Sequence, residues 1–338
     1  MKAVVVERFG SPRDLVLRAW PMPVPGAGEV LIDVHALGLN FPDVLVAAGK
    51  YQNLRPQPFV PGKELAGVIV AVGDGVESFA VGDRVMAQLE NGAFAETVAV
   101  RCEHCFEMPD ALPMTKAAAM GLAYQTAWFA LFDRARITQG ETVLITGAGG
   151  GVGAAAIQIA KASGCRVLAG IGSPNKADFV RALGADAVID MSGADLRDAV
   201  RQQVYAACEG RGADVVIENV GGPGFEACLR ALAWAGRLVV VGFASGEIPS
   251  VRANYILMKH ITVTGLNWSD YRDRSPDAMH RAQDDLFRMV GKGQIDPPIC
   301  AVLPMDEIAS AMELITERKA LGKVVLVTAK GGKAASQS

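Results

Sequence analysis

Long runs of charge and clusters of histidine are missing from this 338-residue chain. It contains four histidines, and its 33 lysines and arginines nearly balance 36 acidic residues, which leaves a formal net charge of −3. No stretch of lysine and arginine is long enough to form a binding surface for nucleic acid. We therefore expect no nucleic-acid partner.

Targeting and membrane segments are not expected either. Only four apolar residues, 3–6, precede Glu7, and this run is too short for a secretory signal. Residues 143–160 carry no charge, but five glycines lie between positions 147 and 153 and indicate a turn rather than a continuous helix. These patterns predict a cytoplasmic protein with no membrane partner.

Cysteine is scarce and scattered, with six residues in total. In a chain without a signal, this favours reduced thiols over a disulfide framework. Cys102, His104 and Cys105 lie close together, but zinc needs three or four ligands, usually with some from a second paired element. The sequence contains no second Cys pair or His pair. We therefore predict structural cysteines and no metal site here.

The order of the patterns predicts two regions of different architecture. The first third reads as short strands joined by glycine turns, which indicates a compact, mostly antiparallel barrel. From about residue 142, apolar strands alternate with helices, which indicates an α/β region with a buried parallel sheet of about six strands. Two amphipathic helices (276–291 and 306–318), a closing strand (323–328) and a disordered polar tail (329–338) are expected to follow.

A glycine-rich loop joins the first predicted strand of the parallel sheet to its first helix. Such a loop makes a tight turn, lets a pyrophosphate approach the backbone, and aims helix N–H groups at its charge. In the G-x-G-x-x-G frame, the three positions are Ala148, Gly150 and Gly153, so the first glycine has become alanine. Within its strand-and-helix context the loop predicts a dinucleotide site, against the alternative of a turn without ligand. The residues expected to bind the cofactor are Gly150, Gly151, Val152 and Gly153.

The end of the second predicted strand favours NADPH over NADH. An acid at this position accepts a hydrogen bond from the ribose 2′-hydroxyl of NAD, and no Asp or Glu occurs between residues 167 and 175. Ser173 and Lys176 follow the strand and could bond and neutralise a 2′-phosphate instead. The alternative for Lys176 is a solvated lysine at a helix start.

Several separate motifs resemble one family over nearly the whole chain, to about residue 328. They include "GLNFPDVLVAAGKYQ", "PFVPGKELAGVIVAVG", "AAAMGLAYQTAW" and "FEACLRALAWAGRLVVVGFASG". The chain resembles the medium-chain dehydrogenase/reductase superfamily, and within it the zinc-independent NADPH:quinone oxidoreductase branch that includes zeta-crystallin. The resemblance implies a GroES-like β-barrel substrate domain (1–124 and 267–338) and a doubly wound Rossmann NADPH-binding domain (125–266). It also implies that the nicotinamide lies in a cleft between them and that the protein is a homodimer joined through the edge strand of the second domain.

The resemblance also implies that the protein uses no zinc. Zinc-dependent relatives carry their catalytic ligands at positions that correspond here to Asn40, Lys63 and Leu122. None of these residues could rebuild that site, and the lobe with four spaced cysteines is missing. Lys63 itself has two interpretations, a cation that contacts an anionic intermediate or a solvated loop lysine, and the second is favoured.

Matching positions imply the site residues. The catalytic candidates are Asn40, Asp43, Tyr51 and Thr126, although Asp43 could simply hold its loop by backbone hydrogen bonds and Tyr51 could be structural. Met191 is a departure, because many relatives carry a tyrosine there near the adenosine phosphates. Further cofactor contacts are expected at Phe243, Leu266, Asn267, Gly322 and Lys323.

Without zinc, a conjugated acceptor is the easier target for hydride, because charge is delocalised before protonation. Asn40 and Thr126 would orient nicotinamide and acceptor oxygen, and Tyr51 would donate a hydrogen bond or a proton. We expect an NADPH-dependent reductase of quinones or other conjugated carbonyls such as enones. The alternatives are an enoyl or acryloyl thioester reductase, a non-catalytic NADPH-binding structural protein, and a metal-dependent alcohol dehydrogenase.

Overall fold

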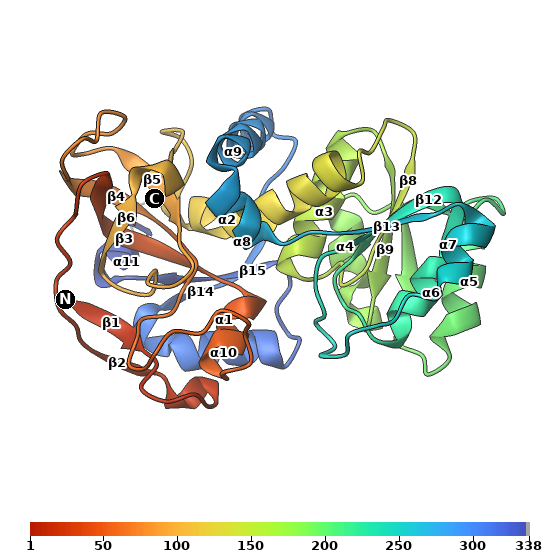
Figure 1. Ribbon diagram of the computed structural model, residues 1–338, viewed down its shortest axis with the longest axis horizontal. Coiled ribbons are helices and arrows are strands. Elements are labelled where there is room, and N and C mark those ends of the chain that lie inside the picture. The colour runs from red at the N-terminus through yellow and green to blue at the C-terminus, as the bar shows by residue number, and fades with distance from the viewer. Residues whose placement is uncertain (336–338) are drawn as a thin grey trace. The chain divides into compact units, whose positions relative to one another are not determined.

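The computed structural model describes residues 1–335 and divides the chain into two compact units (Figure 1). Unit 1 comprises Met1–Ala123, Ser269–Phe287 and Pro297–Ser338, and unit 2 comprises Tyr124–Trp268 and Arg288–Asp296. The helix α2 (Met114–Trp128) carries the chain from the first unit into the second.

Unit 1 is built on a seven-stranded sheet, and the predicted antiparallel character is confirmed. The strand order is β14-β15-β3-β4-β5-β7, with β6 paired to β3, and only the β14–β15 pair is parallel. Buried residues alternate along the first part of β3 and pack with β4 into one apolar core. The strands are β3 (Glu29–Leu39), β4 (Glu64–Val72), β5 (Arg84–Gln88), β6 (Thr97–Arg101), β7 (Cys105–Glu107), β14 (Ile299–Pro304) and β15 (Lys323–Val327). A small sheet pairs β1 (Lys2–Val5) with β2 (Val16–Ala19).

Two segments far apart in the sequence pair in unit 1. The strand β15 lies against β3, with Leu326 opposite Leu37 (Figure 1). The helix α10 (Ile308–Thr316) follows β14 and contributes Ile308, Ala311 and Met312 to the same core. The other helices that lie wholly or mainly in unit 1 are α1 (Phe41–Ala47), α8 (Trp268–Arg274) and α9 (Pro276–Gly291).

The prediction of disorder after β15 is wrong for the residues that the structure describes. Residues 329–335 form α11 (Ala329–Ala335), while residues 336–338 lie outside the described part of the chain. Gly331 packs so closely on β3 that a Cβ atom would lie 2.0 Å from the carbonyl oxygen of His35. Lys330 also pairs with Asp33 at 2.5 Å. Residues 330 and 331 thus contact a strand up to 297 residues earlier in the chain, and the polar composition of the segment could not reveal these contacts.

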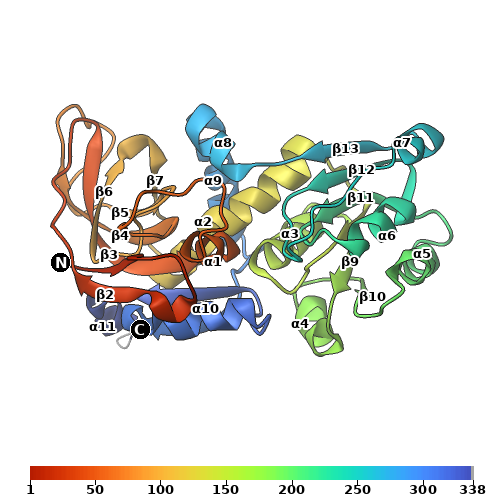
Figure 2. The same cartoon turned by 60° about the horizontal axis from the view of Figure 1, so that its bottom comes forward.

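Unit 2 contains the predicted six-stranded parallel sheet, with the order β10-β9-β8-β11-β12-β13 (Figure 2). The order reverses direction between β8 and β11, and this is the point where doubly wound sheets bind ligands beyond their strand ends. The strands are β8 (Thr142–Ile145), β9 (Arg166–Ile171), β10 (Ala187–Asp190), β11 (Ala213–Glu218), β12 (Leu232–Val240) and β13 (Thr262–Gly265).

Helices cover this sheet and complete the alternating pattern. Two of them, α5 and α6, pack on each other and on a core that includes Leu144, Val216 and Leu238, while α3 packs on β8 and β9. The helices are α3 (Gly151–Ala162), α4 (Ala177–Ala182), α5 (Leu196–Ala207), α6 (Pro223–Ala231) and α7 (Ala253–Lys259). Among residues 1–335, no helix is both long enough and apolar enough to span a bilayer.

Candidate functional site

A buried carboxylate, Glu64, organises one end of the unit 1 sheet. Its Oε1 accepts a hydrogen bond from Nζ of Lys323 at 2.7 Å and from Nδ2 of Asn40 at 2.7 Å. Its Oε2 accepts one from the backbone N–H of Leu122 at 2.6 Å. These four residues, which we call the Glu64 cluster, connect the end of β3, β4, α2 and β15.

Lys323 is fully engaged inside this cluster. Besides Glu64, its ammonium donates to the carbonyl oxygen of Leu39 at 2.9 Å and to Oδ1 of Asn40 at 2.6 Å. The preceding residue, Gly322, has a φ of +77°, and a Cβ there would lie 2.4 Å from the carbonyl oxygen of Pro298. Lys323 thus has three acceptors within unit 1, and direct contact with a cofactor stays a prediction for both residues.

Two glycines make room for the Glu64 carboxylate. A Cβ atom on Gly38 would lie 2.3 Å from Oε1 of Glu64 and 2.1 Å from the carbonyl oxygen of Ala118. A Cβ atom on Gly121 would lie 2.6 Å from Oε2. A side chain at either position would therefore collide with the Glu64 carboxylate, and at Gly38 also with backbone.

Asp43 lies beside the Glu64 cluster at the start of α1. The backbone N–H of Asn40 donates to its Oδ2 at 2.8 Å, while its buried Oδ1 accepts no hydrogen bond from residues 1–335. Burial raises the pKa of Asp43 from the ordinary 3.8 to about 7, although the cations of Lys63 and Lys323 oppose the shift. Asp43 is therefore both a helix-start residue and a carboxyl that can hold a proton near neutral pH.

Lys63 is buried, so the preferred interpretation as a solvated loop lysine is wrong. Only 1% of its side chain is exposed, and Nζ bonds to Oε1 of Glu90 at 2.8 Å and to the Glu90 carbonyl oxygen at 3.0 Å. The ammonium also lies 4.5 Å from the ring centroid of Tyr51. Burial and the Glu90 carboxylate raise the pKa of Tyr51, whereas a polar interaction with Ser269 lowers it. The structure thus brings Tyr51 to Lys63, a pairing that no local pattern signals.

In unit 2, the glycine loop lies between β8 and α3, as predicted. Gly150 precedes the first turn of α3, which contains Gly151, Val152 and Gly153. A Cβ atom on Gly153 would lie 2.4 Å from the carbonyl oxygen of Gly147, so only glycine allows the helix to pack this closely on the loop. The helix start follows the carboxyl end of β8, an arrangement suited to a pyrophosphate.

Glu218 holds the neighbouring loop in place, and the sequence analysis overlooked it. It is the last residue of β11 and is fully buried, and burial raises the pKa of its carboxyl. It accepts hydrogen bonds from Oγ1 of Thr146 at 3.0 Å and from the N–H groups of Val220 and Gly221. Asn219 donates from Nδ2 to the Thr146 carbonyl oxygen at 2.7 Å. The available signal in the sequence was Glu218 itself, an acid at the end of the predicted buried strand "DVVIE".

The remaining cofactor candidates in unit 2 follow the carboxyl ends of parallel strands and therefore lie along one edge of the sheet. Ser173 and Lys176 follow β9, Phe243 follows β12, and Leu266 and Asn267 follow β13. Thr126 lies on α2 and is 5% exposed, and its Oγ1 has no hydrogen-bond partner within the described residues. Met191 packs its sulfur over Gly170, where a Cβ atom would lie 2.7 Å away.

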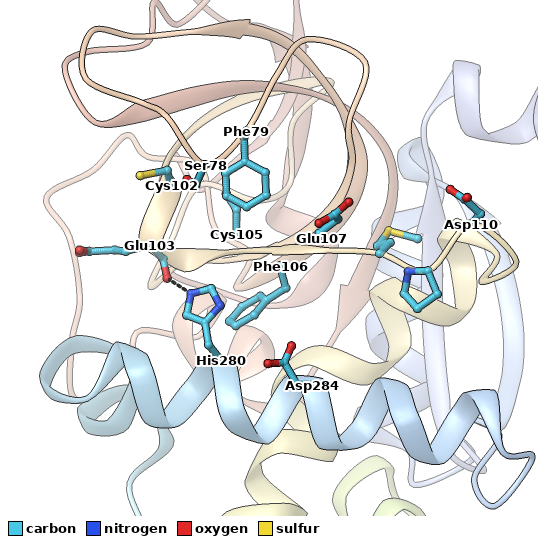
Figure 3. A pocket seen from close by; sticks show the side chains of 12 residues that line it. Ser78, Phe79, Cys102, Glu103, Cys105, Phe106, Glu107, Asp110, His280 and Asp284 are labelled. Atoms are coloured by element: carbon cyan, nitrogen blue, oxygen red, sulfur yellow. Dashed lines mark hydrogen bonds between the residues drawn. The ribbon is translucent and has the colours of Figure 1, made fainter.

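Cys102, Glu103 and Cys105 line a cavity of about 760 Å³ in unit 1 (Figure 3). His280 and Asp284 project from α9 toward it, and the Nε2 atom of His280 lies 2.9 Å from the Glu103 carbonyl oxygen (Figure 3). All six cysteines are unpaired. Across residues 1–335, no three His, Cys, Asp or Glu side chains gather so as to hold a metal ion.

The two units are those of a protein of the dehydrogenase and reductase class, with a Rossmann-type parallel sheet and a separate sheet domain. Two family models match accordingly. Residues 26–112 match the alcohol dehydrogenase GroES-like domain, and residues 151–284 match the zinc-binding dehydrogenase model. The predicted GroES-like and Rossmann-type architecture is therefore confirmed.

Comparison with similar proteins identifies the family within this class. The chain is 36% identical over 330 residues to quinone oxidoreductase-like protein 2 homolog of Nematostella vectensis, which covers 97% of this chain and 89% of that one. A mycobacterial protein solved in complex with NADPH matches with a TM-score of 0.90 and 31% identity, over 97% of this chain and 100% of that one. The CurK enoyl reductase matches with a TM-score of 0.87 and 27% identity, over 97% and 99%. The chain belongs to the quinone oxidoreductase branch of the medium-chain dehydrogenase/reductase superfamily.

Asp43→Asn tests the buried carboxyl. Because the folded-state pKa is about 7 against an ordinary 3.8, the unfolded chain releases a proton between about pH 4 and pH 7 that the folded chain keeps. The free energy of unfolding contributed by this group therefore falls as pH rises through that window. Asparagine keeps an acceptor for the Asn40 N–H but cannot titrate. We therefore expect the difference in Tm, variant minus wild type, to be several degrees larger at about pH 8 than at about pH 5. A difference independent of pH would contradict this assignment.

Proposed function

We propose that this protein is an NADPH-dependent reductase that transfers hydride to quinones or other conjugated carbonyl acceptors without zinc. The observation that carries the proposal is the replacement of all three zinc-ligand positions of the zinc-dependent relatives. Asn40 is bonded within the Glu64 cluster, Lys63 is paired with Glu90, and Leu122 offers only its backbone N–H to Glu64. Similarity to quinone oxidoreductases supports the same function.

The glycine loop of unit 2 fits a nicotinamide dinucleotide. Gly153 lets α3 pack closely on the loop, and the start of α3 presents backbone N–H groups after β8. The region after β9 has no acid to repel a 2′-phosphate, and it offers Ser173 and Lys176. We therefore assign the preference to NADPH, which supplies the hydride when bound.

The protein's own part in the reaction is to orient the acceptor and supply a proton. Reduction of a quinone adds one hydride and one proton and yields a hydroquinone and NADP⁺. Asn40 and Thr126 would orient the reacting groups as hydrogen-bond donors, and Tyr51 would deliver the proton to the acceptor oxygen. Asp43, whose pKa is about 7, is a second group that can hold a proton near neutral pH.

Two alternatives remain distinguishable. Similarity to an enoyl reductase favours reduction of an enoyl or acryloyl thioester, which uses the same hydride addition to a conjugated carbon. A non-catalytic NADPH-binding protein would keep the glycine loop but would not need a buried proton donor. Oxidation of NADPH should be followed against a panel of quinones, enones and acryloyl thioesters. We expect the highest kcat/KM with a quinone or enone and substoichiometric zinc by elemental analysis. Turnover with thioesters alone would favour the alternative enzyme, and no turnover with any acceptor would favour the non-catalytic one.

Lys176→Ala tests the cofactor assignment. Removal of a cation next to a 2′-phosphate should raise the KM for NADPH by about tenfold or more, because a charge-assisted hydrogen bond is lost. The KM for NADH, which lacks the phosphate, should change little. An equal effect on both cofactors would remove Lys176 from the binding site.

We also propose that the protein forms a homodimer through the β13 edge of unit 2. Within the described residues, β13 pairs only with β12, so its other edge has no strand partner. Nearby, Trp234, Leu257 and Met258 are each about three-quarters exposed, at 73%, 74% and 74%. Exposed apolar side chains of this size next to an open strand edge are typical of an interface.

Leu257→Lys combined with Met258→Lys tests the dimer. Both side chains are already exposed, so the folded monomer should tolerate the change, while two added cations should prevent association of the apolar surfaces. Sedimentation velocity should show a dimer for the wild type and a monomer for the variant, with NADPH affinity retained. A wild-type monomer, or a variant that stays dimeric, would contradict this interface.

A further inference from the structure

The contacts of Lys63 leave its ammonium inaccessible to a substrate. The side chain is 1% exposed, and two of its contacts go to the side-chain and backbone oxygens of Glu90. Its other close neighbour is the face of the Tyr51 ring, 4.5 Å from Nζ to the ring centroid. A desolvated ammonium over an aromatic face is attracted by the ring quadrupole. Besides Glu90, the group on which the charge of Lys63 acts most closely is therefore the Tyr51 ring.

The counter-ion of Lys63 is itself held in place. Oε2 of Glu90 accepts hydrogen bonds from Oγ of Ser269 at 3.0 Å and from Nη1 of Arg272 at 3.1 Å. Arg272 is 4% exposed and also binds Asp273 at 2.7 Å. Positive and negative charges thus alternate from Lys63 through Glu90 and Arg272 to Asp273. Lys63 and Arg272 can remain buried because each has an opposite charge beside it, while Asp273 at the end of the row is 54% exposed.

Tyr51 belongs to a segment with no regular secondary structure of its own. One side of Tyr51 packs with a small apolar group formed by Val6, Val46 and Phe59. The contact of the ring face with the Lys63 ammonium completes the support. Glu90 binds both Lys63 and Ser269, so one carboxylate fixes the cation that lies at the ring.

We propose that Lys63 is a positioning residue that holds the Tyr51 ring and, with Glu90, sets the proton affinity of its hydroxyl. The proposal deepens the proposed function, because it concerns the residue assigned to proton delivery. A cation beside a phenol favours the phenolate on general electrostatic grounds. Burial and the Glu90 carboxylate raise the pKa of Tyr51 and so favour the phenol. The other groups that face Tyr51 are Asp43, which raises its pKa, and Arg272, which lowers it.

Lys63→Met tests the proposal, because methionine has a similar length but carries no charge. The chain contains five tyrosines, so the full-length protein can be labelled throughout with difluorotyrosine, whose phenol ionises at lower pH. The ¹⁹F resonance of residue 51 is the one missing from Tyr51→Phe. In Lys63→Met we expect this resonance to shift and its titration midpoint to move to higher pH. We expect kcat to fall about tenfold, with the KM for NADPH within about twofold of the wild type.

Lys319→Met is the matched control, because it removes an exposed lysine that pairs with Glu317 and should leave the Tyr51 resonance and kcat unchanged. Glu90→Gln provides an independent arm that does not require Lys63→Met to fold. Loss of the carboxylate should move the midpoint of residue 51 to lower pH, opposite to the effect of Lys63→Met. Lys63→Arg, which keeps the charge, should retain a midpoint closer to the wild type than methionine does.

The outcomes separate this proposal from the proposed function. An unchanged Tyr51 resonance in Lys63→Met, or midpoints that do not move in opposite directions in Lys63→Met and Glu90→Gln, would overturn the positioning role. If Lys63→Met does not fold, an unmoved midpoint in Glu90→Gln overturns it. If Lys63→Met moves the resonance as expected while Tyr51→Phe keeps full turnover, the positioning role stands. In that case Tyr51 is not the proton donor, and the proposed function loses that step.

Discussion

The buried ion pair between Glu64 and Lys323 is the contact on which the architecture of unit 1 depends. Removing two charges from water costs several kcal/mol per ion, and the cost is offset only when every remaining donor and acceptor is bonded. Here the lysine has three oxygen acceptors, and the carboxylate also receives an amide and a backbone N–H. Because the partners come from β15 and β4, the pair joins the end of the chain to the sheet begun by its first hundred residues. Loss of one partner would leave an uncompensated buried charge, which typically costs about 3–5 kcal/mol.

Lys63, the residue before Glu64, belongs to a second pair of opposite charges, and this pair lies at the candidate site. Lys63 and Glu64 are neighbours of opposite charge, and each is bonded to a different opposite charge, Glu90 and Lys323. Asn40, Asp43 and Tyr51 are placed by these two pairs rather than by the strands alone. Of the positions that hold zinc ligands in metal-dependent relatives, Lys63 is paired with Glu90, while Asn40 and Leu122 donate hydrogen bonds to Glu64. Unit 2 uses a comparable device, since buried Glu218 ties the loop after β11 to Thr146 beside the glycine loop.

Much of the fold could be predicted because its signals are local. Alternating strands and helices from about residue 142 predicted the parallel sheet, and glycines between β8 and α3 predicted the loop that Gly153 lets pack so closely. The early glycine-punctuated strands likewise predicted a mostly antiparallel sheet. Prediction was wrong where the deciding partner lay far along the chain. Lys63 looked solvated because Glu90 is 27 residues away, and the tail after β15 looked disordered because its contact surface is β3.

The sequence by itself determined the class of fold, the dinucleotide loop and the replacement of all three zinc-ligand positions. The first two follow from periodicity and glycine spacing, the third follows from the resemblance to the family, and none of them needs a distance. Only the tertiary structure decided that Lys63 is buried against Tyr51, that Lys323 bonds to Asn40 and Glu64, and that Asp43 can hold a proton near neutral pH. The physical reason is that burial and charge pairing depend on groups brought together across up to 283 residues. A residue's type shows that it can carry charge, but its surroundings decide whether that charge meets water, a partner or an aromatic ring.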